Sequence, residues 1–304
     1  MHHDLHDHDL GLAHDLKVME QMMARRRALK LFAGIGGAGL LGACGGSGSG
    51  STNVATASAT PTPTPSATAT ATPTPTPAAT QSPSTACVAL PTETNGPYPA
   101  DGTNSSRGST SNVLTSSGVV RSDIRASFLG TTTAAAGVPV TLTLTVVDVN
   151  SACAVLPNYA VYIWHCDATG NYSLYDVPAE SWLRGVQVTN AAGQVTFTTI
   201  FPGCYAGRFP HMHFEVFSSL ATATGGRYAS LVSQLAMPGA ACSAVYGGAS
   251  ATYGSSASRF ASTTTSNDNV FGDNTSAQVT AMTPTFSGSV ADGYTMAATI
   301  GLAR

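Results

Sequence analysis

Hydrophobic and polar residues alternate with a period of two in several stretches of the second half of the chain. In a β-strand, successive side chains point to opposite faces, so this alternation predicts strands with one buried face. Short strands separated by turn-forming residues predict an all-β fold, an antiparallel β-sandwich with long loops. The predicted strands are Val138–Val149, Tyr159–His165, Gln194–Ile200, His211–Phe217 and Tyr294–Leu302.

Helical periodicity is weak after residue 87, apart from a possible turn at Ala257–Ala261. The segment Gly247–Ser276 is rich in Ser, Thr, Gly and Asn, a composition typical of loops. We therefore predict long surface loops between the last two strands.

Residues 1–44 have the composition of an export signal. Arg26 and Arg27 precede an apolar, glycine-rich stretch, Leu31–Ala43, which is too short to span a membrane and suits a twin-arginine signal peptide. Leu41-Gly42-Ala43-Cys44 resembles a lipoprotein cleavage box that would leave Cys44 as a lipidated first residue. We expect an exported protein at the bacterial cell envelope or periplasm, with membrane contact only through this anchor. An ordinary secretory signal with a fortuitous cysteine is the alternative.

Residues 45–86 are almost entirely Gly, Ser, Thr, Ala and Pro, with Thr-Pro repeats between Thr60 and Pro77. Such a segment cannot bury a core, so we predict a disordered linker. Residues 87–304 are long enough to form one domain with its own core.

Charge and cysteine content narrow the class of protein. The part after Cys44 has eight arginines, no lysine and eleven carboxylates, which argues against nucleic-acid binding. It also carries five cysteines, an odd number, which in an exported protein favours disulfides with at least one thiol left over. Their pairing is left open; they are Cys87, Cys153, Cys166, Cys204 and Cys242.

Histidine is scarce in the predicted domain, because five of the eight histidines of the chain precede residue 15. His211 and His213 lie two positions apart in a predicted strand, so their imidazoles share one face, as does Glu215. Two adjacent imidazoles suit a metal site. His165 ends an apolar strand, and we assign it a structural role.

Two tyrosines extend this candidate metal site. Tyr172 follows Gly170 in a turn, and Tyr205 precedes His211 by six residues. A phenol has an unperturbed pKa of about 10, so it binds a metal near neutral pH only when a strongly Lewis-acidic ion such as Fe(III) displaces its proton. Taken singly, the tyrosines could pack at strand ends and the histidines could form a surface pair. We favour an iron site because the four occur together.

The flanks of these residues resemble the core signature of the intradiol ring-cleavage dioxygenases, which include the catechol 1,2- and protocatechuate 3,4-dioxygenases. The resemblance covers roughly Cys87–Leu235. It rests on Asn95–Pro99, Trp164–Ala168, Gly170–Ser173, Leu183–Gly185, Phe197–Gly203 and Arg208–Phe214. It implies a mononuclear non-haem Fe(III) bound by Tyr172, Tyr205, His211 and His213, with Tyr205 displaced when substrate arrives.

The resemblance also implies an activity: cleavage of a catechol-type aromatic diol with O2 to a muconate-type dicarboxylate. Tyr205 would accept a proton and Arg208 would stabilise negative charge on the ring, while Tyr98 and Gln187 are candidate pocket residues. Asn95 stands where catechol-cleaving relatives usually carry an acidic residue. The alternatives are a non-catalytic cell-surface β-sandwich that keeps the iron site as a binding module, and a metal-free structural lipoprotein. The oligomeric state and the particular catechol are left open.

Overall fold

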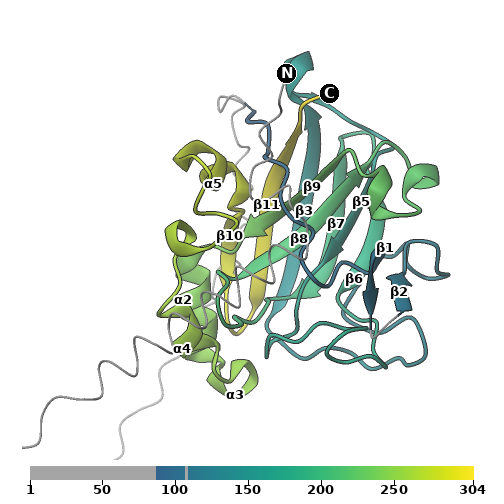
Figure 1. Cartoon of the computed structure of the whole chain (residues 1–304). Helices are drawn as coiled ribbons and strands as arrows, with labels where there is room; N and C mark the ends of the chain where they lie inside the picture. Colours follow the sequence, from purple (N-terminus) through teal and green to yellow (C-terminus); the bar gives the residue numbers. More distant parts are fainter. Residues whose placement is uncertain (1–86, 107–108) are drawn as a thin grey trace, which may run out of the picture. The chain divides into compact units, whose positions relative to one another are not determined.

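The structure is a computed structural model that describes residues 87–106 and 109–304 (Figure 1). The predicted signal, residues 1–44, and the predicted linker, residues 45–86, lie outside the described residues. Within the described ranges, none of the helices has the length and apolar character needed to cross a membrane.

The first sheet is built around the long strand β3 (Pro139–Asp148). On one side β3 pairs in parallel with β11 (Gly293–Leu302), which in turn pairs with β10 (Thr285–Ser289). On its other side β3 pairs antiparallel with β7 (Gln194–Ile200) and, further along, with the short β4 (Ala154–Val155). One parallel pair therefore stands in an otherwise antiparallel sheet.

The second sheet is antiparallel, and its strands lie in the order β6 (Arg184–Val188), β5 (Ala160–Trp164), β8 (His211–Phe217) and β9 (Leu231–Ala236). A separate two-stranded ribbon is formed by β1 (Asp101–Ser106) and β2 (Ser109–Asn112).

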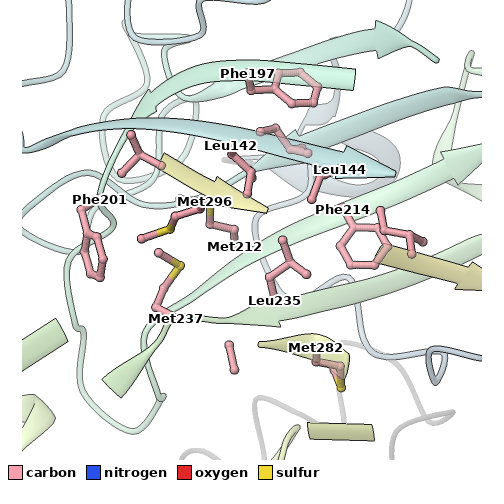
Figure 2. Close-up of a cluster of buried hydrophobic side chains, with 14 of the residues drawn as sticks. Leu142, Leu144, Phe197, Phe201, Met212, Phe214, Leu235, Met237, Met282 and Met296 are labelled. Atoms are coloured by element: carbon pink, nitrogen blue, oxygen red, sulfur yellow. The ribbon is translucent and has the colours of Figure 1, made fainter. Parts of the chain in front are cut away.

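The main hydrophobic core lies between the two sheets (Figure 2). Leu142 and Leu144, two positions apart on β3, point into this core, as do Met212 and Phe214 on β8. Each of these side chains is at most 1% exposed. Each such side chain contributes about 1.5–3 kcal/mol relative to an exposed position. Because β8 gives its even-numbered residues to this core, its odd-numbered residues must face the other way.

The predicted all-β class is confirmed, and the alternating stretches form strands. The predicted strands Gln194–Ile200 and His211–Phe217 coincide with β7 and β8, and Tyr294–Leu302 is β11 less its first residue. The parallel pairing of β11 with β3 differs from the purely antiparallel arrangement that we expected.

The expectation of loops alone between the last strands is wrong, because this region folds into short helices. They are α2 (Gly239–Gly248), α3 (Ser250–Tyr253), α4 (Ser256–Phe260) and α5 (Ser276–Met282), and brief 3-10 turns lie at Val149–Ser151, Leu220–Thr222, Gly226–Tyr228 and Thr265–Asn267. Their small residues give little amphipathic signal. One local signal was present: Thr275 and Gln278 form a capping box at the start of α5.

One disulfide, between Cys87 and Cys153, joins the start of the domain to the turn after β3. Cys166, Cys204 and Cys242 are free thiols, and all three are buried. This pairing answers the question that cysteine number alone left open.

Candidate metal centre

The outer face of β8 carries His211, His213 and Glu215, opposite the face that packs into the main core. All three side chains are at least 98% buried, because a second cluster of aromatic residues covers this face. The register of the sheet places Trp164 beside His213 and Tyr162 beside Glu215. The two histidines therefore lie on the same face of β8, as predicted.

His211 is held in one ring orientation by its own chain. Its Nδ1 lies 2.6 Å from the carbonyl oxygen of Phe209, which can only accept a hydrogen bond, so Nδ1 carries the proton. Nε2 then presents a free lone pair to the site. The hydroxyl of Tyr205 donates to this atom at 3.0 Å. Such a carbonyl behind the distal nitrogen is the usual support of a metal-binding histidine.

His213 is positioned by packing. Its ring stacks on Trp164, with 4.8 Å between the ring centroids and 8° between the planes. A Cβ added at Gly96 would lie 3.1 Å from Cε1 of His213, so the backbone of residues 94–99, which we term the Gly-Pro-Tyr segment, packs directly against the imidazole. The Nε2 atoms of His211 and His213 are 3.1 Å apart. Both rings therefore aim at one point.

The two tyrosines reach this point from different loops. Tyr172 follows β5 in the chain, and its main-chain N–H donates to Asp176 at 2.8 Å. Its hydroxyl lies 3.5 Å from that of Tyr205. A Cβ at Gly170, whose φ is +94°, would lie 3.0 Å from Cβ of Tyr205, so glycine permits the two loops to meet. Tyr172 is fully buried, whereas part of Tyr205 is exposed.

Burial sets the protonation of all four groups. It lowers the pKa of His211 to about 3, with the Arg208 charge adding to the effect, and lowers the pKa of His213 well below its ordinary value. Burial also raises the pKa of Tyr172 and of Tyr205 above that of a free phenol. All four side chains are therefore neutral near pH 7.

This donor set fits a trivalent iron ion. Both buried imidazoles disfavour an added proton, so each can offer Nε2 to a cation as a neutral ligand. A hard, highly charged cation would stabilise the phenolate forms that burial alone opposes. In residues 87–106 and 109–304, no three His, Cys, Asp or Glu side chains are grouped to hold a metal.

Arg208 supplies a fixed positive charge beside the four donors. Its Nη1 lies 3.4 Å from Nε2 of His211, and its Nε donates to Oδ2 of Asp268 at 2.9 Å. Its Nη2 donates to Oε1 of Gln234 at 2.6 Å. Burial alone would lower the pKa of Arg208, but the carboxylate of Asp268 outweighs it and the net pKa is raised. The guanidinium therefore stays charged.

The Gly-Pro-Tyr segment closes over this cluster. The ring of Tyr98 lies 4.9 Å from that of Tyr172 and 5.0 Å from that of Tyr175. Gln234 connects the segment to the guanidinium of Arg208, because its Nε2 donates to the carbonyl of Thr94 at 2.9 Å. Tyr98 thus lies against the predicted ligands, where a substrate pocket would need it.

Other residues singled out from the sequence lie elsewhere or act differently. Gln187 pairs with Val161, whose side chain belongs to the main core, so alternation places Gln187 on the face of the sheet away from His213. The structure does not bring it to the cluster. His165 bonds the carbonyl of Cys166 and the hydroxyl of Thr199, a structural arrangement.

Three buried polar residues near the cluster were not singled out as site residues from the sequence. Asp268 and Gln234 contact Arg208 from positions 60 and 26 residues further along the chain. Arg184 donates to the side chain and the carbonyl of Ser173, next to Tyr172. Leu183-Arg184-Gly185 was part of the family signature, but no local pattern indicated where the guanidinium points.

A dioxygenase family model matches residues 123–221, the part of the chain that carries Tyr172, Tyr205, His211 and His213. The chain is similar to the intradiol ring-cleavage dioxygenases. The matched part runs from the segment before β3 to the turn after β8. No curated protein is similar enough to match the chain.

Solved structures of similar proteins include several dioxygenases. An intradiol ring-cleavage dioxygenase from Tetranychus urticae is 24% identical over 61% of this chain and 87% of its own, with a TM-score of 0.48. The dioxygenase domain of a carbohydrate-binding fusion from Streptomyces sp. SirexAA-E is 21% identical over 71% and 99%, with a TM-score of 0.43. Catechol 1,2-dioxygenase from Acinetobacter sp. ADP1 is 20% identical over 55% and 53%, with a TM-score of 0.35.

Proposed function

We propose that this intradiol-dioxygenase-like protein is a non-haem Fe(III) enzyme that cleaves a catechol-type aromatic diol with O2 to a muconate-type dicarboxylate. One observation carries the proposal: four donor atoms converge, the hydroxyls of Tyr172 and Tyr205 and the Nε2 atoms of His211 and His213. The distance is 3.5 Å between the two hydroxyls, 3.0 Å from Tyr205 to His211, and 3.1 Å between the two Nε2 atoms. The dioxygenase match over residues 123–221 supports it independently.

Fe(III) at this point would bind the diol oxygens and draw electron density from the ring, which makes a ring carbon reactive toward O2. The chain supplies the donors and their protonation. Tyr172, fully buried, would remain a fixed donor, and both imidazoles would bind through Nε2. The partly exposed Tyr205 is the donor able to move. Held as a phenolate, its oxygen would take a proton from the incoming diol and become a neutral phenol.

The remaining contributions are electrostatic and steric. Arg208 places a permanent positive charge 3.4 Å from Nε2 of His211, where it would stabilise negative charge on a bound ring. Tyr98 and Trp164 enclose the cluster with aromatic surface and reduce its contact with water. These are the groups that an aromatic dianion would require.

Oxygen uptake tests the activity. The iron-loaded full-length chain is expected to consume O2 with catechol, protocatechuate or hydroxyquinol, and to form a dicarboxylate that mass spectrometry identifies. Tyr172→Phe and His213→Ala should lose both iron and uptake, whereas Tyr228→Phe, at an exposed site, should retain them. Bound iron without uptake on any diol would overturn the enzymatic proposal and favour a binding module that keeps the iron site.

We also propose that the protein is exported and anchored through Cys44, on the strength of the sequence signals. The Cys87–Cys153 disulfide supports export, because such bonds persist in oxidising compartments. Metabolic labelling with a radioactive fatty acid should mark the wild-type chain and leave Cys44→Ser unmarked. Equal labelling of both chains would exclude the anchor.

A further inference from the structure

The loop that leads into Tyr205 is bonded at each residue. The main-chain N–H of Phe201 donates to Val138 at 2.8 Å, and that of Gly203 donates to Asp167 at 2.9 Å. The carbonyl of Gly203 accepts from the thiol of Cys166 at 3.5 Å. The carbonyls of Phe201, Pro202 and Cys204 and the N–H of Cys204 meet side chains from a distant part of the chain. That part is α2, α3 and α4, residues 239–260, which we term the helical arm.

Each helix of the arm contributes a contact. From α2, the hydroxyl of Tyr246 donates to the carbonyl of Pro202 at 2.9 Å. From α3, the hydroxyl of Tyr253 donates to the carbonyl of Phe201 at 2.9 Å. From α4, Oγ of Ser256 accepts from the N–H of Cys204 at 3.0 Å. All three helices therefore hold the loop.

Arg259 at the end of α4 joins the two tyrosine loops. Its Nη1 donates to the carbonyl of Cys204 at 3.2 Å and to the carbonyl of Thr169 at 3.3 Å. Cys204 immediately precedes Tyr205, and Thr169 lies three residues before Tyr172. One guanidinium therefore fixes the separation of the two loops that carry the phenols.

The arm also closes the far side of this loop. Only five residues separate Tyr205 from His211, so the loop is too short to build a core of its own. Instead, Phe260 packs on Phe209 with ring centroids 5.6 Å apart. The support for Tyr205 thus comes from residues that follow the second sheet, outside the part of the chain that matches the dioxygenase family.

We propose that the helical arm positions Tyr205, and that Arg259 connects the arm to the loop that carries Tyr172. This inference rests on the proposed function, because in it the arm holds two iron ligands at a set separation. With residues 201–204 fixed, Tyr205 moves by rotation of its side chain and not by movement of its main chain. The main-chain positions of both tyrosines are then kept when the Tyr205 side chain rotates.

Cys204 provides a readout that needs no iron. Cys204 belongs to the loop and its side chain is fully buried, so alkylation of its thiol requires the loop to open. Cys242, on α2, is also fully buried and reports general unfolding. In the iron-free full-length chain, Arg259→Gln should make alkylation of Cys204 about tenfold faster relative to Cys242, since two hydrogen bonds are lost. Mass spectrometry locates the label.

Further variants separate positioning from folding. Ser256→Ala removes the acceptor of the Cys204 N–H and should also speed labelling of Cys204. Arg259→Lys, whose ammonium can still donate to a carbonyl, should restore most of the protection. Arg125→Gln removes an arginine from an exposed ion pair and should leave the labelling ratio unchanged. Equal acceleration at both cysteines in Arg259→Gln, or no acceleration, would overturn the proposal.

The second readout uses the iron-loaded chain. Arg259→Gln should shift the visible phenolate-to-Fe(III) absorption and raise KM for the diol more than it lowers kcat, whereas Arg125→Gln should do neither. An unchanged spectrum in Arg259→Gln would also overturn the proposal. If the wild-type chain takes up no Fe(III), the proposed function fails, and the labelling ratio alone decides whether the arm holds the loop.

Discussion

Replacing Asp268 by asparagine removes the only carboxylate bonded to Arg208 in the described part of the chain. Oδ2 of Asp268 accepts from Nε of Arg208 at 2.9 Å and from the N–H of Phe209 at 2.6 Å. Oδ1 accepts from the N–H groups of Val270 and Phe271 at 2.8 and 3.1 Å. Asparagine keeps the shape but offers an amide in place of one oxygen, so donors would face donors.

The magnitude follows from burial. The side chains of Arg208 and Asp268 are 5% and 0% exposed, and breaking a buried pair by removing one partner costs about 3–5 kcal/mol. By comparison, Asp123→Asn breaks a pair whose side chains are 41% and 50% exposed, which is worth at most about 1 kcal/mol. Domains of this class have about 5–15 kcal/mol of stability, so the variant should still fold.

Urea unfolding of the iron-free chain measures the difference. With a slope near 3 kcal/mol per molar, Asp268→Asn should lower the midpoint by more than about 1 M and Asp123→Asn by less than about 0.3 M. Burial alone would raise the pKa of Asp268, but Arg208 outweighs it and the net pKa is lowered. Its contribution is therefore present above the unfolded pKa and lost as pH falls through the folded one. A loss no larger than that of Asp123→Asn at pH 7 would refute the reasoning.

Three other perturbations have definite expectations. Burial raises the pKa of Glu93 to about 7, so its protonated form favours folding and that stability is lost as pH rises through 7. At pH 8 the free energy of unfolding of Glu93→Gln should be up to about 3 kcal/mol higher than that of the wild type. At pH 4 the two free energies should be equal. Replacing Cys87 and Cys153 by serine opens a bridge over 66 residues and should cost about 4 kcal/mol in urea unfolding. Gly96→Ala places a Cβ 3.1 Å from His213 at a φ of +69°, and should reduce iron bound per chain in metal analysis.

The strands could be predicted because their residues alternate strictly. Alternate side chains of two strands, Gln194–Ile200 and His211–Phe217, are buried in the main core. Apolar residues therefore recur at every second position of these strands. Strand β9, Leu231–Ala236, was missed because its sequence, Leu-Val-Ser-Gln-Leu-Ala, does not alternate between apolar and polar residues with a period of two. The helices of residues 239–260 were missed because they are short and built from small residues.

The candidate ligands could be predicted because residue type and order identify them. Their surroundings could not. Asp268 lies in a segment rich in Ser, Thr and Asn, and only the folded chain brings its carboxylate to Arg208. Gln187 was expected to be a pocket residue, yet the register of β6 turns it to the other face. Long-range pairing carries no local signal, so the sequence indicates which groups take part and the fold decides which of them meet.

The visible absorption spectrum of the full-length chain, purified from iron-replete cells, tests the central claim most directly. We expect a phenolate-to-Fe(III) band that shifts when catechol, protocatechuate or hydroxyquinol is added without oxygen, and that is absent in Tyr172→Phe. A colourless protein that takes up no Fe(III) would contradict the assignment of Tyr172, Tyr205, His211 and His213 as iron ligands.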